Sequence, residues 1–219
     1  GYTDINRMLK SVPGVNVYEE DGYGLRPNIS LRGTKAERSE RITLMEDGVL
    51  AAPAPYAAPA AYYFPNAGRM YAIEVLKGSS QVQYGPFTTG GAINMVSTPI
   101  PSKFSLKANA SYGSYNTLKS YFSVGNRFKY TGFIIEYLRY QSDGFRKDVP
   151  NERTGFKRND IIAKFAAQTN NEEGLNHLFE LKFGFANETS DETYLGLSEQ
   201  DFALRPYYRY AGAQKDNLK

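Results

Sequence analysis

The chain has 219 residues, enough for one large domain or two smaller ones. Its 26 basic and 23 acidic residues are spread along the sequence and leave a net charge of +3, without the basic stripe of nucleic-acid-binding proteins. Cysteine is absent and His177 is the only histidine, which excludes thiolate zinc sites, cysteine nucleophiles and most histidine-centred triads and argues against an enzyme.

Residues 1 to about 98 hold one expected helix and several short strands separated by Gly, Pro and Asp. Thr3 or Asp4 is placed to cap a helix that runs to Lys10 and ends at Pro13-Gly14. This half is therefore expected to form a small α+β domain. Its expected strands are Val15 to Glu19, Asn28 to Arg32, Ile42 to Glu46, Met70 to Lys77 and Ala92 to Ser97.

From Lys103 onward the pattern changes to longer strands in which apolar and polar residues alternate. Each strand is close to the ~9–11 residues with which a tilted strand crosses an outer membrane, and no segment approaches the ~18 apolar residues of a membrane-spanning helix. Phe104, Leu106, Ala108, Ala110 and Tyr112 share one face of the first strand. The other strands are expected at Thr117 to Asn126, Thr131 to Tyr140, Asp160 to Thr169 and His177 to Asn187.

The connections between these strands differ in length. Residues 127–130 and 170–176 form short links, whereas residues 141–159 and the segment after Glu188 are long and polar. Outer-membrane barrels have this asymmetry, with short periplasmic turns and long extracellular loops, although the short hairpin at 113–116 is an exception. A soluble up-and-down barrel is the alternative that the pattern leaves open. Because five strands cannot close a membrane barrel, we expect the native polypeptide to continue past Lys219.

Six short motifs follow one another in the first half. They are Pro13-Gly14-Val15, Arg32-Gly33, Asp47-Gly48-Val49, Glu74 to Gly78, Tyr84-Gly85 and Gly90 to Val96. In their order and approximate spacing they closely resemble the plug domain of TonB-dependent outer-membrane receptors. The resemblance implies a fold in which an α+β plug domain, residues 1–98, precedes the first strands of an antiparallel transmembrane β-barrel, residues 99–219, with about five strands of a barrel of ~22.

The resemblance also implies a location and a function. Such receptors lie in the bacterial outer membrane and import nutrients into the periplasm, here a ferric chelate such as ferric citrate or a siderophore. The implied partners are TonB with its inner-membrane energising complex, the chelate and outer-membrane lipid, and no nucleic acid. The resemblance implies no cofactor, because iron travels as part of the chelate substrate. It also implies a TonB box, which is expected before Gly1. The alternative is the same architecture importing a glycan or a cobalamin.

A finer resemblance narrows the family. The loop Ala52 to Pro59, together with Gly196-Leu197-Ser198 and Arg205-Pro206-Tyr207, is similar to the ferric-citrate receptor branch. Asp47-Gly48 is expected to form a tight turn with positive φ. Gly90-Gly91 is expected to permit close backbone approach where a plug packs inside a barrel wall, with an ordinary loop as the alternative.

Two groups of residues are candidates for ligand binding. Tyr56, Tyr62 and Tyr63 lie in a proline-stiffened loop that loses little entropy when it binds a ligand, although packing against the barrel interior is the alternative. Arg38 and Arg41 are placed to donate charge-assisted hydrogen bonds to the carboxylates of an anionic chelate, unless their segment is only a solvated loop.

Arg32 and Lys77 stand at the ends of expected strands. The resembled family places basic residues there that pair with carboxylates of the barrel wall, and an ion pair of that kind is a releasable latch rather than a strong stabilising contact. Two solvated surface cations are the alternative. The wall glutamates are expected beyond Lys219.

Overall fold

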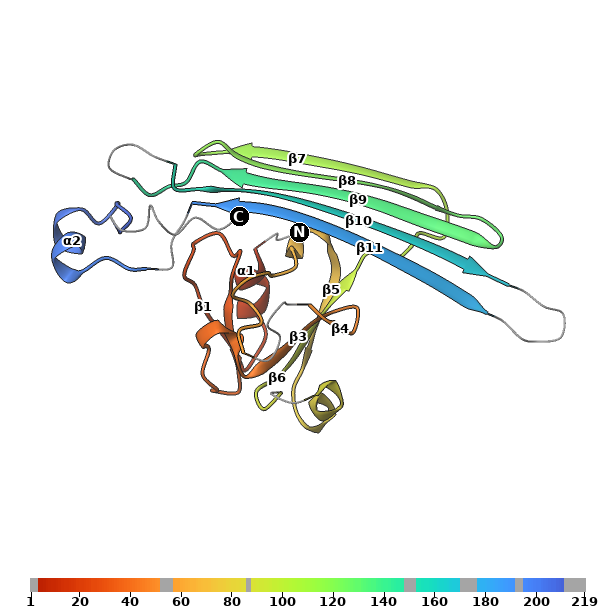
Figure 1. The fold of residues 1–219 in the computed structure, drawn as a ribbon, viewed down its shortest axis with the longest axis horizontal. Coiled ribbons are helices and arrows are strands. Elements are labelled where there is room, and N and C mark those ends of the chain that lie inside the picture. The colour runs from red at the N-terminus through yellow and green to blue at the C-terminus, as the bar shows by residue number, and fades with distance from the viewer. Residues whose placement is uncertain are drawn as a thin grey trace. The chain divides into compact units, whose positions relative to one another are not determined.

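The computed structural model describes residues 4–51, 57–85, 88–147, 153–169, 177–191 and 195–210. The chain divides into two compact units, Gly1–Thr98 and Pro99–Lys219, and Figure 1 labels most of their helices and strands. Among these described residues, no helix has both the length and the apolar character that a membrane span requires.

The first unit begins with helix α1 (Ile5–Lys10), which Asp4 caps by accepting a hydrogen bond from the Asn6 N–H at 2.9 Å. A four-stranded sheet of order β4-β3-β6-β5 follows a separate β1-β2 pair, and β3 and β6 run parallel within it. The expected strands all form within one residue of their predicted ends, whereas β4 was not predicted. The elements are β1 (Val15–Tyr18), β2 (Asn28–Leu31), β3 (Ile42–Glu46), β4 (Val49–Leu50), β5 (Met70–Leu76) and β6 (Gly91–Ser97), with 3-10 helices η1 (Glu37–Ser39), η2 (Ala67–Arg69) and η3 (Ser79–Tyr84).

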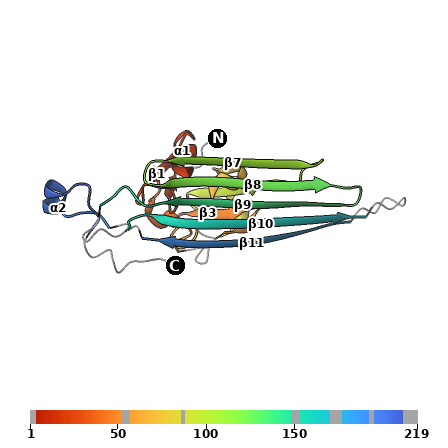
Figure 2. The ribbon, with the colours of Figure 1, turned by 90° about the horizontal axis from the view of Figure 1, so that it is seen from above.

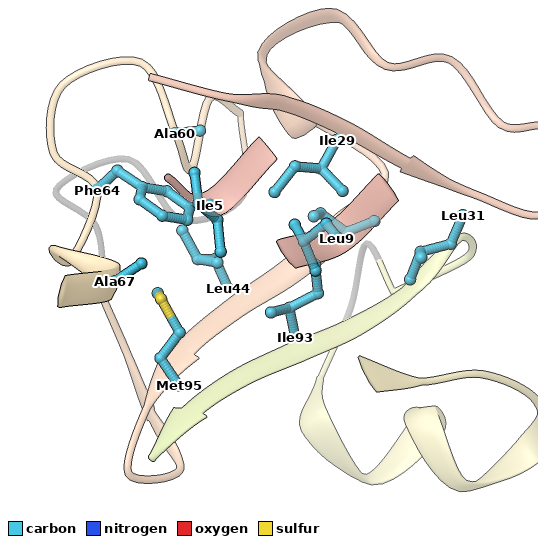
Figure 3. Packing of buried hydrophobic residues seen from close by; sticks show 11 residues of the cluster. Ile5, Leu9, Ile29, Leu31, Leu44, Ala60, Phe64, Ala67, Ile93 and Met95 are labelled. Atoms are coloured by element: carbon cyan, nitrogen blue, oxygen red, sulfur yellow. The ribbon is translucent and has the colours of Figure 1, made fainter. Parts of the chain in front are cut away.

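The core of the first unit lies between α1 and the sheet. Ile5 and Leu9 are four residues apart, so they share one helix face, and both are buried against Leu44 of β3 and Ile93 of β6 (Figure 3). Met95, two residues after Ile93, points to the same side of β6 and extends the contact (Figure 3). Each such aliphatic side chain stabilises the fold by about 1.5–3 kcal/mol on burial.

Two glycine positions support the packing of this sheet. Asp47 and Gly48 both have positive φ, 51° and 80°, which confirms the expected tight turn, and this turn joins β3 to β4. At Gly91 a Cβ would lie 2.3 Å from Leu31 Cδ1 and 2.7 Å from the Leu76 carbonyl oxygen. The close backbone approach expected at Gly90-Gly91 is therefore present within the first unit, and packing against a barrel wall stays a prediction.

The second unit contains a five-stranded antiparallel sheet whose strands lie side by side in chain order (Figure 2). Strands β10 and β11 extend beyond their predicted ends, and helix α2, which follows the sheet, was not predicted. The elements are β7 (Ser105–Gly113), β8 (Thr117–Arg127), β9 (Thr131–Ser142), β10 (Phe156–Gln168), β11 (Leu178–Ser190) and α2 (Glu199–Leu204).

The two faces of this sheet differ in chemistry. Phe122, Tyr137, Ile161 and Phe185 stand opposite one another across β8, β9, β10 and β11. They belong to an exposed surface, here called the apolar face, on which Phe183 is 61% accessible. Its members are Leu106, Ala108, Ala110, Tyr112, Leu118, Phe122, Val124, Phe133, Ile135, Tyr137, Ile161, Ala163, Phe165, Ala167, Phe179, Leu181, Phe183 and Phe185.

The opposite face carries the charged residues and is called the charged face. Glu136 and Asp160 are each only 1% exposed there, and Tyr121 donates a hydrogen bond of 2.5 Å to Glu136 Oε1. The face includes Lys107, Lys119, Glu136, Arg158, Asp160, Lys164, Glu180, Lys182 and Glu188. A soluble up-and-down barrel would bury its apolar face, whereas this face has exposed side chains on all five strands, which disfavours that alternative.

Candidate functional site

Arg38 is held in an unusual backbone conformation. Arg38 and Ser39 have positive φ values of 51° and 56°, which cost a non-glycine residue about 1–2 kcal/mol each. The Arg38 N–H donates to Asn28 Oδ1 at 2.7 Å, and the buried Ser39 hydroxyl accepts from the Ile29 N–H at 2.9 Å. Ser39 also donates to the Pro27 carbonyl at 3.1 Å. These contacts support the strained turn while the Arg38 side chain stays exposed, and backbone strain of this kind clusters at functional sites.

The charged side chains around Arg38 mostly pair with one another. Lys35 and Glu37 lie 2.5 Å apart, and their hydrogen bond, reinforced by opposite charge, raises the pKa of Lys35 and lowers the pKa of Glu37. Arg41 Nε lies 3.4 Å from Glu40 Oε1. In the described part of the chain Arg38 makes no ion pair, so its guanidinium is available to an anion.

The candidate tyrosines occupy different environments. Tyr62 is 60% exposed, whereas the Tyr63 hydroxyl accepts a hydrogen bond of 3.3 Å from Arg69 Nη2. Arg69 is buried and also makes two 2.8 Å contacts with the Glu46 carboxylate. Tyr56 lies outside the described residues. Tyr62 therefore offers an exposed ring for stacking, and Tyr63 is anchored to the domain by the Arg69–Glu46 pair.

The arginines and the tyrosines are anchored at opposite ends of β3. Arg41 directly precedes this strand, and Glu46, which holds the Tyr63 side of the loop, is its last residue. Five residues of extended strand separate these ends by about 13 Å. No hydrogen bond or ion pair between described residues joins Arg38 or Arg41 to Tyr62 or Tyr63. The structure therefore presents two candidate contact surfaces, one cationic and one aromatic.

Arg32 and Lys77 meet at the turn that follows α1. The Arg32 N–H donates to the Gly14 carbonyl at 2.9 Å, and Lys77 Nζ donates to the Pro13 carbonyl at 2.5 Å. The Arg32 guanidinium also donates to Gln81 Oε1 at 3.3 Å. Three of the sequence motifs thus converge on one corner of the first unit. Pairing of the two cations with wall carboxylates stays a prediction.

Sequence reasoning missed the residues that hold these candidates in place. Asn28 and Ser39 support the Arg38 turn, and they are 11 positions apart in the printed sequence. Arg69 contacts a carboxylate 23 residues away. The available signal was that Arg69 is the only charged residue between positions 57 and 73, which suggests a paired charge but does not identify its partner.

The chemistry of both surfaces suits ligand binding. Exposed guanidinium groups donate hydrogen bonds to carboxylates or phosphates, and an exposed aromatic ring adds apolar contact area. Within the described ranges, no group of three or more His, Cys, Asp or Glu side chains is placed to hold a metal ion.

Comparisons with known protein families and solved structures show what this chain is similar to. Residues 1–92 match the family described as TonB-dependent Receptor Plug Domain. The ferric citrate transporter FecA in its unliganded form is 25% identical with a TM-score of 0.78, over 95% of this chain and 32% of that chain. The copper transporter OprC shares the fold, with a TM-score of 0.63 at 22% identity over 86% of this chain and 28% of that chain.

Curated relatives include vitamin B12 transporters. BtuB of Photobacterium profundum is 26% identical over 164 residues, covering 73% of this chain and 26% of that protein. BtuB of Vibrio vulnificus (strain CMCP6) is 24% identical over 205 residues, covering 91% of this chain and 31% of that protein. The chain therefore spans less than a third of the length of each of these relatives.

Proposed function

Through residues 1–92 this chain belongs to the TonB-dependent receptor plug family. From that premise we propose that it acts in the bacterial outer membrane as part of a receptor that imports a ferric chelate into the periplasm. The observation that carries the proposal is the likeness to the ferric citrate transporter FecA. That likeness reaches a TM-score of 0.78 over 95% of the chain, so it continues past the plug domain into the strands β7 to β11.

The apolar face supports the membrane part of the proposal. A sheet with one long exposed apolar face and one charged face suits a wall between lipid and a polar interior. The strands run from 9 to 13 residues, enough for the ~9–11 residues that a tilted strand needs to cross the bilayer. In this proposal the sheet is the beginning of a barrel of about 22 strands.

The cationic surface supports the choice of ligand. An iron chelate such as ferric citrate carries exposed carboxylates, and the guanidinium groups of Arg38 and Arg41 are exposed to receive them. Tyr62, with Tyr56 and Tyr63 in the same loop, provides the aromatic contact. Arg32 and Lys77 are proposed to pair with wall carboxylates, and TonB with its inner-membrane complex to supply the energy for release of the ligand.

Uptake by whole cells tests the proposal. A strain that lacks the gene is supplied in turn with ferric citrate, a ferric siderophore, cyanocobalamin and an oligosaccharide. We expect the restored gene to permit uptake of a ferric chelate only while TonB is present. Uptake of cyanocobalamin or oligosaccharide instead of iron would contradict the choice of ligand, and uptake that persists without TonB would contradict the mechanism.

Substitutions in the cationic segment test the residues. Arg38→Gln and Arg41→Gln should each weaken binding of ferric citrate about tenfold, since hydrogen bonds to charged groups contribute about 1.5–3 kcal/mol. Lys35→Gln is the matched control because Lys35 lies in the same segment but is held by Glu37 at 2.5 Å, whereas Arg41 lies 3.4 Å from Glu40 and Arg38 makes no ion pair with a described residue. Equal losses in all three variants would show a general charge effect and would remove the assignment to Arg38 and Arg41.

A further inference from the structure

The apolar face carries charge in one place. Among the described residues of β7 to β11, the charged side chains on this side of the sheet are Arg139 and Lys157. Both are positive and both lie at the same end of the sheet. Arg139 is three residues before the end of β9, and Lys157 is the second residue of β10.

These two cations mark the boundary where apolar residues give way to polar ones. Tyr137 and Ile161 stand opposite each other as the last apolar pair of β9 and β10. The next pairs along the same face are Arg139 with Asn159 and Gln141 with Lys157. Asn187 and Thr189 of β11 continue the polar band on one side, whereas on β8 Ser120 is followed by Leu118 opposite Gln141.

The Arg139 side chain is oriented by neutral partners. Its Nε and Nη2 donate to Gln141 Oε1 at 3.0 and 2.6 Å, and its Nη1 lies 3.5 Å from Asn159 Oδ1. The Tyr137 hydroxyl donates to the same Asn159 oxygen at 2.9 Å. None of these groups neutralises the guanidinium, so a positive charge is positioned next to the apolar band without a carboxylate partner among the described residues.

The neighbouring cation Arg158 shows that this sheet can supply carboxylate partners for a basic side chain. Arg158, one residue from Lys157 but on the charged face, lies 3.5 Å from Asp160 Oδ2 and 3.4 Å from Glu188 Oε2. Lys157 points to the other side, is exposed, and makes no ion pair with a described residue. Arg139 and Lys157 are diagonal neighbours, a relation that places the two residues about 7–8 Å apart, so one anionic group can reach both side chains.

We propose that Arg139 and Lys157, with Gln141 and Asn159, bind a phosphate group of a membrane lipid whose acyl chains lie along the apolar face. The inference rests on the proposed placement of this face in the outer membrane. A guanidinium and an ammonium group both suit a phosphate, and basic residues at the level of the headgroups attract anionic lipids. The adjacent Tyr137 and Ile161 favour a lipid over a free anion, because apolar contact with the chains adds to the binding.

Lipid binding by the full-length protein in detergent provides the test, with lipid A that carries both phosphates as the probe. We expect Arg139→Gln and Lys157→Gln each to weaken binding about fivefold, the effect of one basic residue at an anionic membrane surface. The double variant Arg139→Gln with Lys157→Gln should bind diphosphorylated lipid A weakly. Lipid A without phosphates should bind the unsubstituted protein with the same low affinity. Lys107→Gln, the same change on the charged face, is the matched control and should leave binding unchanged.

Three results would overturn the inference. The double variant could retain the affinity for diphosphorylated lipid A, the lipid without phosphates could bind equally well, or inorganic phosphate at the concentration of the lipid could displace it. An unchanged heat-dependent shift in gel mobility shows that each variant is folded. A nitroxide label at position 183 separates the two proposals. If the label lies in lipid and the double variant still binds lipid A normally, only this inference fails. If the label lies in water, the membrane placement of the apolar face fails as well.

Discussion

Arg38 combines an exposed guanidinium with a positive φ, a backbone conformation that is uncommon for non-glycine residues. Asn28 and Ser39 hold that conformation through three hydrogen bonds. These hydrogen bonds offset the local strain and so keep the Arg38 side chain in this position. Such an arrangement suits a residue that must meet a ligand in one orientation.

Glycine substitution separates strain from function at this position. We expect Arg38→Gly to raise the free energy of unfolding by up to about 1 kcal/mol, because glycine adopts positive φ without the steric cost, while binding of ferric citrate falls. Arg41→Gly is the control, since Arg41 is not among the positive-φ residues and glycine there should destabilise by about 0.5–1 kcal/mol. Urea unfolding followed by circular dichroism measures both. A loss of stability of equal size in the two variants would contradict the assignment of strain to Arg38.

The Arg69–Glu46 pair anchors the tyrosine loop and gives a second prediction. Removing one partner of a buried ion pair leaves an uncompensated charge, so Arg69→Met should reduce the free energy of unfolding by about 3 kcal/mol. Arg69→Lys keeps the charge but loses the two-pronged contact and should cost less. The double variant Arg69→Met with Glu46→Gln should recover part of the loss. No recovery in the double variant would show that Arg69 acts through packing rather than through its charge.

At the scale of elements, the apolar face supplies a prediction about assembly. Phe183→Arg places a charge at the middle of the exposed band of β11 and should cost about 2–4 kcal/mol in a bilayer, with loss of folded protein from the outer membrane. Ala186→Arg is the control because it adds the same side chain to the charged face of the same strand, opposite Asp160. The amount of each variant in isolated outer membranes measures the effect. Equal depletion of both would contradict the assignment of the two faces.

The strands of the second unit were predictable because apolar and polar residues alternate strongly along them. The residues at which these strands begin and end were not predictable. β10 begins at Phe156, four residues before its predicted start at Asp160. The apolar face becomes polar there, at Lys157 and Asn159, so alternation disappears from the sequence although the hydrogen-bonded ladder with β9 continues. A pattern of hydrophobic residues reports where a face is apolar, and backbone pairing is not limited to that region.

The candidate site was predicted at the level of segments only. Composition identified the charged segment that holds Arg38 and the aromatic segment that holds Tyr62. The placement of these segments at opposite ends of β3 depends on the contact of Arg69 with Glu46, residues 23 positions apart. Pairings between distant segments leave no local trace in one sequence.

At the scale of the whole molecule, the mean hydropathy of -0.51 and the net charge of +3 conceal two different kinds of surface. In the second unit, strands that carry apolar residues on one face carry the charged residues mostly on the other, which dilutes the hydropathy. The first unit instead buries its apolar residues in a core of its own. The same composition thus serves a domain with a closed core and a sheet with an exposed apolar face, the combination that the proposed receptor requires.

The most direct test of this account is the solvent that each side chain of β11 contacts. Single cysteines at positions 179 to 189 are labelled with a nitroxide, and its collision rates with oxygen and with a water-soluble nickel chelate are measured in membranes. We predict that positions 179, 181, 183 and 185 collide mainly with oxygen, as lipid-facing residues do, and that the intervening positions do not. High accessibility of those four positions to the nickel chelate, without alternation along the strand, would contradict the proposal that this sheet is a membrane wall.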